Sequence, residues 1–361
     1  MDDQLTAQDQ AHLRRALELA EGGRGRVSPN PLVGAVVVRG ETVIGEGFHA
    51  ELGGLHAERA VLADCSERGE DPAGATMYVT LEPCAHEGRQ PPCVEAILEA
   101  GIGRVVIASD DPSEKTAGKG PEILRDGGVE VAFANGAEAT AARRLNQPFR
   151  KHARTGLPLV VLKMAMSLDG QTTTAPGDSP WISGPESRDL VHKWRAESDA
   201  IAVGIGTVLA DDPLLTARID GARQPLRVVF DSQARLPLDS QLMKTLDQAP
   251  VLVVTAHDAP AERRSPLGHG GAEAIAATDI ESALRTLGRR GITSLFLEGG
   301  RTLASSFLAA GQIDESRTFI APVLIGGSEK GGDAGRRLTA IESSSEPIGD
   351  DVLITARYKE W

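Results

Sequence analysis

Aromatic residues, cysteines and positive charge are all scarce in this chain of 361 residues. Phe, Trp and Tyr make up 3% of it, whereas proteins that bind single-stranded nucleic acid stack the bases on such rings. Lys and Arg number 38 against 51 Asp and Glu, so the formal net charge is -13 and no basic excess can neutralise a phosphate backbone. Both shortages argue against a nucleic-acid partner, although a few well-placed arginines could still bind a small anionic substrate.

Long apolar runs and paired cysteines are also missing. Three cysteines do not make a disulfide framework. No apolar stretch approaches the roughly 20 residues that span a bilayer. The N-terminal segment is polar and then amphipathic, unlike a signal peptide. We therefore expect a cytoplasmic, reduced protein with no membrane partner.

The chain does contain two successive series of alternating strands and helices. In the first series an N-terminal helix is followed by a hairpin and then by alternating helices and strands, complete by about residue 135: 8–22, 32–49, 56–68, 75–81, 92–101, 104–109, 120–128 and 129–134. This alternation predicts a layered α/β unit around a mostly buried sheet.

A helical connector follows, and the break at Gly156, Leu157 and Pro158 marks the boundary region. In the second series helices are expected at 185–197, 280–290 and 301–311. Strands are expected at 159–170, 199–206, 226–231, 251–256, 294–300, 315–327 and 351–361. The sequence "ESSSEP" at 342–347 is expected to be a solvated loop. The length and the break together predict two domains, 1–150 and 151–361.

His56, Glu58, Cys84 and Cys93 form a pattern that favours a catalytic zinc site. One imidazole and two thiolates are ligands that zinc prefers, and a catalytic site keeps its fourth position for water. The metal lowers the pKa of that water, and Glu58 is close enough in sequence to pass its proton to a departing amine. His56 and Cys93 each open a predicted helix, where partial positive charge favours a thiolate. Cys65 has no place in the pattern and is assigned to packing.

Three alternatives stand beside this interpretation. Taken singly, the cysteines could be buried packing residues and His56 a surface histidine. A structural zinc module would need a fourth protein ligand, and His86 is near enough in sequence to be one. A nucleoside or tRNA deaminase with an unrelated C-terminal module is disfavoured by the lack of basic and aromatic residues. The combined H-x-E and P-C pattern favours a zinc deaminase.

The segment resembles the cytidine-deaminase superfamily, except that eight residues, "AHEGRQPP", separate the two cysteines. This stretched spacing and "SPNPLVGAVVV" at 28–38 resemble the deaminase half of the bifunctional riboflavin-biosynthesis deaminase/reductases. The resemblance implies a cytidine-deaminase-like three-layer α/β/α domain. It also implies that Asn30 contacts the pyrimidine and that His86 and Gly88 belong to a substrate loop.

One loop departs from that family. The family usually has D-P-N-P before a glycine-rich turn, and this chain has "DDPSEKTAGKG". Asp111 and Pro112 match the motif, whereas Ser113 and Glu114 do not. The departure concerns substrate contacts in this loop and leaves the zinc pattern intact.

The second half has no dinucleotide-binding fingerprint, because "GIGTVL" at 204–209 has Leu209 at the third glycine position. A better candidate for a phosphate site is "LFLEGGRTLASSFL" at 295–308, where a strand ends in two glycines before a helix N-terminus. The same pattern is also that of an ordinary strand-to-helix turn. Arg195 and Arg218 could clamp a substrate phosphate, or each could be a surface arginine. "ADDPLLTAR" places two carboxylates, a proline and an arginine in one short turn.

These segments resemble the reductase half of the same family, from about Leu159 to the end of the chain. The resemblance implies a dihydrofolate-reductase-like α/β domain that uses NADPH. The residues implied for the cofactor are Ala165, Trp181, Thr207, Asp211, Ser232, Gly300, Arg301, Thr302, Leu303, Ala304, Ser305 and Ser306. Those implied for the substrate are Ser179, Arg195, Leu215, Arg218 and Glu298. Lys163 lies on the strand that enters the site, and Arg235 is a candidate for the cofactor 2′-phosphate.

The resemblance as a whole implies a two-step enzyme with zinc and NADPH as cofactors. The first domain would remove the 2-amino group of 2,5-diamino-6-(5-phosphoribosylamino)pyrimidin-4(3H)-one by hydrolysis. The second would reduce the ribosyl group of 5-amino-6-(5-phosphoribosylamino)uracil to ribityl, with the hydride supplied by the cofactor. A phosphorylated pyrimidine as partner and a homo-oligomeric state are also implied.

Overall fold

The computed structural model describes residues 5–87, 90–113, 117–174, 181–326 and 337–361. The chain divides into two compact units, one reaching to Thr155 and including Trp361, the other spanning Gly156–Glu360. Each unit is built on one sheet, with five strands in the first and nine in the second. Residue 150 lies inside helix α6 (Gln147–Thr155), and the units divide where that helix ends. Among the described residues no helix is both long and apolar enough to cross a membrane.

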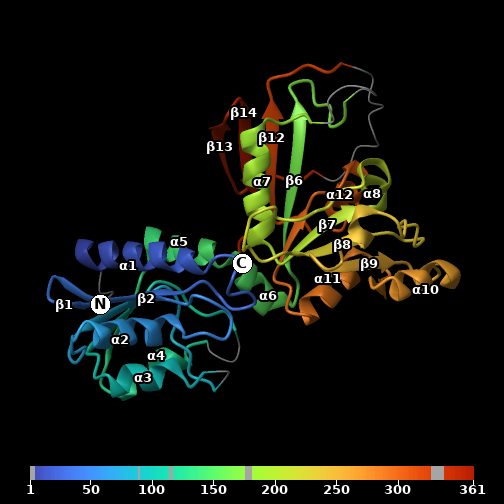
Figure 1. The fold of residues 1–361 in the computed structure, drawn as a ribbon. Coiled ribbons are helices and arrows are strands. Elements are labelled where there is room, and N and C mark those ends of the chain that lie inside the picture. The colour runs from blue at the N-terminus through green and yellow to red at the C-terminus, as the bar shows by residue number, and fades with distance from the viewer. Residues whose placement is uncertain (1–4, 88–89, 114–116, 175–180, 327–336) are drawn as a thin grey trace. The chain divides into compact units, whose positions relative to one another are not determined.

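The first unit is a three-layer α/β/α sandwich with strand order β2-β1-β3-β4-β5 (Figure 1). The predicted hairpin is confirmed as the antiparallel pair β1 and β2, and β3, β4 and β5 run parallel to one another. Its elements are α1 (Ala7–Ala20), β1 (Gly34–Arg39), β2 (Thr42–Phe48), α2 (Ala57–Glu67), β3 (Thr76–Val79), α3 (Cys93–Glu99), β4 (Arg104–Ile107), α4 (Lys119–Asp126), β5 (Glu130–Phe133), α5 (Ala137–Leu145) and α6. The unit therefore continues beyond residue 135 through α5 and α6.

Successive residues of β1 point to opposite faces of the sheet, so this strand packs against both helical layers. Ala35 and Val37 belong to the core shared with α2, α3 and α4, whereas Val36 and Val38 pack with residues of α1 and α5. The next strand, β2, lets α2 come close, because a Cβ added at Gly47 would lie 2.4 Å from a backbone nitrogen of α2. This close contact fixes the N-terminus of α2, where the metal motif begins.

A buried ionic network ties α1 to the sheet. The Asp9 carboxylate accepts hydrogen bonds from Tyr78 Oη at 2.9 Å and from Arg104 Nη1 at 2.6 Å. It also accepts from Thr6, the N-cap of α1, in a capping box. Burial raises the pKa of Asp9, but the hydrogen bonds from Arg104, Thr6 and Tyr78 outweigh it and hold the pKa well below its usual range.

Asp9→Asn is therefore expected to lower the free energy of unfolding of the first unit at pH 7, by about 1–3 kcal/mol. Because the folded-state pKa is depressed, the stabilisation is present above the unfolded-state pKa near 4 and is lost as the pH falls through the folded-state value. The gap between parent and variant should thus narrow below about pH 4 in calorimetric scans. Glu18→Gln, an exposed acid of the same helix, is the control and should change stability little. A gap that is equally wide at pH 3 would contradict this account.

The second unit has strand order β10-β9-β8-β7-β11-β6-β12-β14-β13. All neighbours from β10 to β12 are parallel, and β14 and β13 complete the sheet in antiparallel fashion. The elements are β6 (Leu159–Ser167), α7 (Pro185–Glu197), β7 (Ala200–Gly204), α8 (Ile205–Asp211), β8 (Leu226–Phe230), α9 (Gln241–Lys244), β9 (Val251–Thr255), α10 (Ala261–His269), β10 (Glu273–Ala276), α11 (Ile280–Arg289), β11 (Ser294–Leu297), α12 (Arg301–Ala309), β12 (Glu315–Ala321), β13 (Glu342–Ile348) and β14 (Asp351–Arg357).

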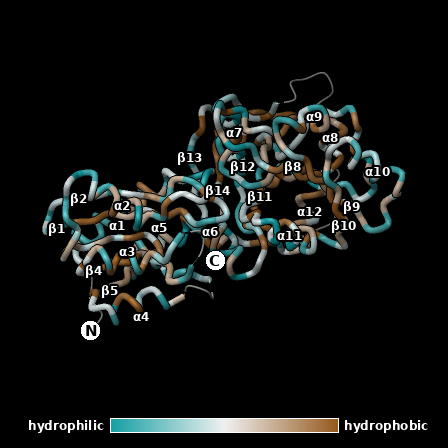
Figure 2. Tube along the Cα trace, turned by 60° about the horizontal axis from the view of Figure 1, so that its bottom comes forward, coloured by the Kyte–Doolittle hydropathy of each residue, from teal (hydrophilic) through white to brown (hydrophobic). Residues whose placement is uncertain are grey.

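Helices cover both faces of this sheet. Leu295 and Leu297 of β11 belong to the core that includes residues of α11 and α12. Phe296, between them, points to the other face and packs against Trp194 of α7, with ring centroids 5.9 Å apart. All five residues of β9 are buried, and all of them but Thr255 are aliphatic. Figure 2 colours the chain by hydropathy. The three helices expected in this half are confirmed as α7, α11 and α12.

Some predicted strands of this half are confirmed but end early, and one predicted loop is wrong. The strand expected at 199–206 is β7 and ends at Gly204, where helix α8 follows at once, and the strand expected at 315–327 is β12 and ends at Ala321. The Ser-rich segment expected to be a loop is strand β13, which pairs along its length with β14. Six of its seven residues are exposed, so no apolar alternation marks it in the sequence, and its Pro347 is tolerated because β13 is an edge strand.

Candidate functional sites

Three side chains of the predicted zinc motif converge in the first unit. His56, Cys84 and Cys93 offer ligand atoms that all lie within 4.8 Å of one another. The His56 Nδ1 atom lies 3.6 Å from Cys84 Sγ and 3.4 Å from Cys93 Sγ. A tetrahedral zinc ion, about 2.0 Å from nitrogen and 2.3 Å from sulfur, holds such atoms about 3.6 Å apart. The donor set and its spacing therefore fit zinc.

Local structure at two helix starts produces this arrangement. His56 is the extended N-cap residue of α2, and Cys93 is the first residue of α3 after the N-cap Pro92. The Cys93 N–H also donates to Cys84 Sγ at 3.3 Å. Hydrogen bonds from Cys93 and His56 lower the pKa of Cys84, which favours the thiolate that a metal requires.

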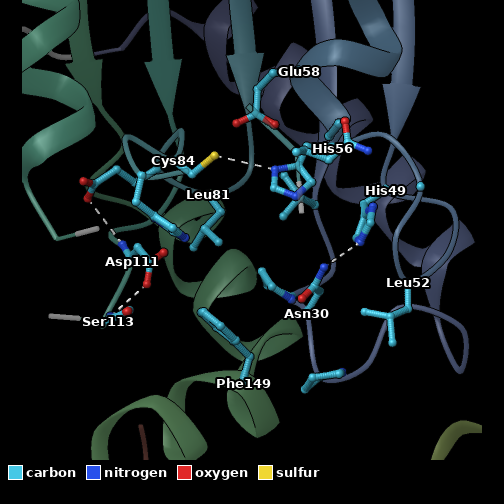
Figure 3. Close-up of a pocket in the computed structure, with 18 of the residues that line it drawn as sticks. Asn30, His49, Leu52, His56, Glu58, Leu81, Cys84, Asp111, Ser113 and Phe149 are labelled. Atoms are coloured by element: carbon cyan, nitrogen blue, oxygen red, sulfur yellow. Dashed lines mark hydrogen bonds between the residues drawn. The ribbon is translucent and has the colours of Figure 1, made fainter. Parts of the chain in front are cut away.

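Glu58 lies in the first turn of α2, beside the ligands and only 4% exposed. In Figure 3 its carboxylate faces the region of Cys84 and His56. Burial, together with the charge of Cys84, raises the pKa of Glu58 to about 7. A carboxyl group with such a pKa can take up and release a proton near neutral pH, as general acid–base catalysis requires.

The other candidate residues are not among the metal ligands, although His86 lines the same pocket. His86 is exposed and does not belong to the ligand group found among the described residues. A closed structural site with His86 as fourth ligand is therefore not supported. Cys65 is buried in the core under the sheet, as predicted for a packing residue. Gly88 and Glu114 lie outside the described residues.

A pocket opens onto the metal ligands, and Asn30 lines it. His49 Nδ1 lies 2.8 Å from the Leu55 carbonyl oxygen, so it must carry the proton and donate. His49 Nε2 is then an acceptor for the Asn30 side-chain amide, 3.1 Å away (Figure 3). Burial also lowers the pKa of His49, which keeps the ring neutral. This chain of hydrogen bonds fixes which way the Asn30 amide faces.

Sequence reasoning missed several residues that line or brace this pocket. Asp111 and Ser113 were noted, and both line it. His49 follows directly after β2, a position that could have signalled a polar group at a sheet edge. Phe149 also lines the pocket but lies in α6, and nothing in its local sequence distinguishes it from a packing residue.

The residues expected for the reductase site gather at one edge of the second sheet. Strands β8, β7, β11 and β6 are consecutive parallel neighbours, so their carboxyl ends share that edge. The expected residues lie near or just beyond these ends: Lys163 and Ala165 on β6; Thr207 and Asp211 on α8, which follows β7; Ser232 beyond β8; and Glu298 with Gly300–Ser306 beyond β11.

The helix that follows β11 begins beside α8. Gly300 is the N-cap of α12, and a Cβ added there would lie 3.7 Å from Thr207 Oγ1. The free N–H groups at the start of α12 can bind an anion. Trp181 is exposed, with the Arg188 guanidinium 5.2 Å from its ring centre. Ser179 lies outside the described residues.

Arg195 and Glu298 form a nearly buried ion pair. Two guanidinium nitrogens of Arg195 donate to the two carboxylate oxygens of Glu298, at 2.7 and 2.9 Å. Their side chains are only 12% and 9% exposed. Burial raises the pKa of Glu298, but the positive charges of Arg195 and Lys163 outweigh the effect of burial and hold this pKa below its usual value. The pKa of Lys163 is also lowered, by its own burial and by the charge of Arg195. Three charged groups thus share one site.

The loop after α8 carries unusual backbone conformations. Leu215 and Arg218 have φ values of 54° and 53°, in the left-handed region that favours glycine. Side chains hold the loop from several directions: Arg195 donates to the carbonyl of Thr216 at 3.2 Å, and Arg227 donates to that of Leu214 at 3.1 Å. Such strain persists where the surrounding structure fixes the backbone, and it often marks a ligand site.

Comparisons with known proteins match a family to each of the two units. Residues 6–109 match the family described as the cytidine and deoxycytidylate deaminase zinc-binding region. Residues 158–354 match the RibD C-terminal domain. The first unit is thus a zinc deaminase of the cytidine-deaminase type, joined to a reductase unit of the RibD type. The chain belongs to the RibD family of bifunctional riboflavin-biosynthesis deaminase/reductases.

Its relatives match over nearly the whole chain. The riboflavin biosynthesis protein RibD of Actinobacillus pleuropneumoniae is 41% identical, over 97% of this chain and 95% of that one. RibD of Escherichia coli (strain K12) is 39% identical, over 90% of each. The solved structure of Acinetobacter baumannii RibD is 38% identical with a TM-score of 0.85, covering 98% of this chain and 99% of that one. A deaminase/reductase from Thermotoga maritima is similar at 35% identity, with the same TM-score and coverage.

Proposed function

We propose that this enzyme deaminates 2,5-diamino-6-(5-phosphoribosylamino)pyrimidin-4(3H)-one and then reduces 5-amino-6-(5-phosphoribosylamino)uracil with NADPH. The observation that carries the proposal is the convergence of His56, Cys84 and Cys93 beside the buried Glu58, at a pocket lined by Asn30. A similar protein from Thermotoga maritima is named for this pair of activities. We assign deamination to the first unit, which reaches to Thr155, and reduction to the second, which begins at Gly156.

In the deaminase site each residue has a distinct role. His56, Cys84 and Cys93 would hold zinc, which lowers the pKa of water and makes it nucleophilic. Glu58 takes a proton from the attacking water and delivers it to the amino group, which leaves as ammonia. Asn30, fixed by His49, orients the pyrimidine ring through its amide.

In the reductase site the chain positions two molecules against each other. NADPH supplies the hydride, and the start of α12, Gly300–Ser306, would hold its phosphates. Ala165, Trp181, Thr207, Asp211 and Ser232 would line the rest of the cofactor site. Ser179, Arg195, Leu215, Arg218 and Glu298 would hold the phosphorylated substrate.

We also propose a cytoplasmic homo-oligomer that binds neither nucleic acid nor membranes. The composition supports this view through its acidity and its lack of aromatic residues. Several apolar side chains near the strands at the end of the second sheet are exposed, among them Leu324, Ile341 and Val352. A second copy of the chain is the kind of partner that covers such residues.

Zinc removal should separate the two reactions. After chelation, the full chain should release no ammonia from the diamino substrate, and no NADPH should be oxidised with it. The same preparation should still oxidise NADPH when the deaminated uracil is supplied, because that site needs no zinc. Ammonia release and absorbance at the NADPH band measure the two steps. Turnover of cytidine alone, or no NADPH oxidation by the intact enzyme, would contradict the proposal.

A further inference from the structure

We propose that the corner between α5 and α6, residues 145–150, helps to position the substrate in the deaminase site. Asn146 and Arg150 would be positioning residues for the two loops that line the pocket, and Phe149 would form part of its wall. The inference rests on the proposed function, because it assigns roles within that reaction.

Asn146 holds the loop that carries Asn30. Its Oδ1 accepts from the backbone N–H of Leu32 at 2.8 Å, and its Nδ2 donates to the carbonyl of Leu32 at 2.9 Å. Asn146 is 3% exposed, so both hydrogen bonds are shielded from water. Leu145 packs beside Val27 and Leu32 of the same loop. The corner thus holds this loop in place through both hydrogen bonds and apolar contacts.

Arg150 holds the second loop from the next turn of the chain. It is 2% exposed, and its Nη1 donates to Ser109 Oγ at 3.1 Å and to the Asp110 carbonyl at 2.8 Å. Its Nη2 donates to the Asp110 carboxylate at 3.2 Å. Ser109 and Asp110 directly precede Asp111, which lines the pocket together with Ser113. One helix start therefore braces both sides of the opening.

Phe149 lies between these two braces and lines the pocket itself. In Figure 3 it lies on the side of the pocket opposite Glu58, near Asn30. It packs against the same core as Val33 and Leu81, which also line the pocket. An aromatic wall of this kind suits the flat face of a pyrimidine.

The corner lies outside the zinc-binding region. The region matched to the deaminase family ends at residue 109, and the metal ligands all lie between 56 and 93. The contribution of the corner to substrate positioning therefore comes from a segment that is separate from the metal ligands. It follows that changes in the corner should affect the KM for the pyrimidine more than the zinc content.

Full-length Asn146→Ala and Phe149→Ala test this separation. Each should raise the deaminase KM by on the order of tenfold or more, with a much smaller change in kcat. Zinc content and NADPH-dependent reduction of the deaminated uracil should stay at the parental level. Phe149→Leu should recover part of the KM effect. Thr140→Ala, a change at a half-buried position of α5 whose hydroxyl donates to the carbonyl of Gly136, is the matched control and should behave as the parent.

Hydrogen exchange gives a readout that needs no turnover. Asn146→Ala should speed exchange of the Leu32 amide and its neighbours at 28–33, whereas Phe149→Ala should leave that amide protected. If Asn146→Ala does not fold, Asn146→Ser and the two Phe149 variants decide the question. A KM within about twofold of the parent in all folded variants overturns the inference. A loss confined to kcat, in proportion to a loss of zinc, also overturns it.

Failure of the proposed function has a different signature. If the parent enzyme deaminates another pyrimidine instead, such as cytidine or deoxycytidylate, the proposed substrate is wrong. The same variants are then compared with that pyrimidine as substrate. If the parent deaminates none of them, both proposals are overturned. If the parent deaminates the diamino substrate and the corner variants match it, only the role of the corner is wrong.

Discussion

Replacing Glu58 by Gln should lower the rate of deamination by about 10²–10⁴-fold while zinc remains bound. The amide has nearly the same shape as the carboxyl group but cannot accept a proton from water and pass it on. Glu58 lies beside the ligand group without belonging to it, so the metal should remain. Ammonia release and metal analysis of the same purified sample give the two measurements.

Two comparisons make this result specific. Cys93→Ser should lose zinc as well as activity, because it removes one of the three ligands. Both variants should keep the NADPH-dependent reduction of the deaminated uracil, which reports on the second unit. Deamination at near-parental rate by zinc-loaded Glu58→Gln would show that another group moves the proton.

Breaking the ion pair in the second unit should have the other large effect. Arg195→Met should abolish measurable reduction and lower the free energy of unfolding of that unit by about 3 kcal/mol. The reason is that the Glu298 carboxylate would stay in a largely buried place without its two hydrogen bonds. Thermal unfolding and NADPH oxidation measure stability and activity separately.

A double variant distinguishes a local role from general damage. Arg195→Met combined with Glu298→Gln removes the unpaired charge, so it should recover most of the lost stability and none of the reduction. Deamination should be unchanged in both, since Glu58 and the metal ligands lie in the other unit. Recovery of reduction together with stability would mean that the pair is structural and has no part in binding or catalysis.

The zinc motif could be predicted because local sequence places it. His56 and Cys93 lie at helix starts that the alternation of strands and helices and the proline before Cys93 indicate, and in the fold the two side chains come together. The same is true of the second sheet, where residues far apart in sequence share an edge because parallel strands end there. In both cases a periodic pattern fixed the position of the functional residues.

The rest of the site depends on tertiary contacts that carry no local signal. Asn146 pairs with a residue 114 positions earlier, and its sequence surroundings are those of an ordinary helix end. Phe149 resembles any apolar residue of a connector until the fold turns it toward the pocket. Strand β13 was missed for a related reason, since its pairing with β14 supplies the order that its own side chains do not.

The left-handed residues Leu215 and Arg218 have a consequence for attempts to make the enzyme more robust. Each holds a conformation that costs an ordinary residue about 1 kcal/mol or more, and neighbouring side chains keep it there. Protein engineering that selects for heat resistance alone would favour glycine at these two positions. Such a choice would also delete the side chains proposed to hold the substrate, so thermostability and reductive turnover would be in conflict at this loop.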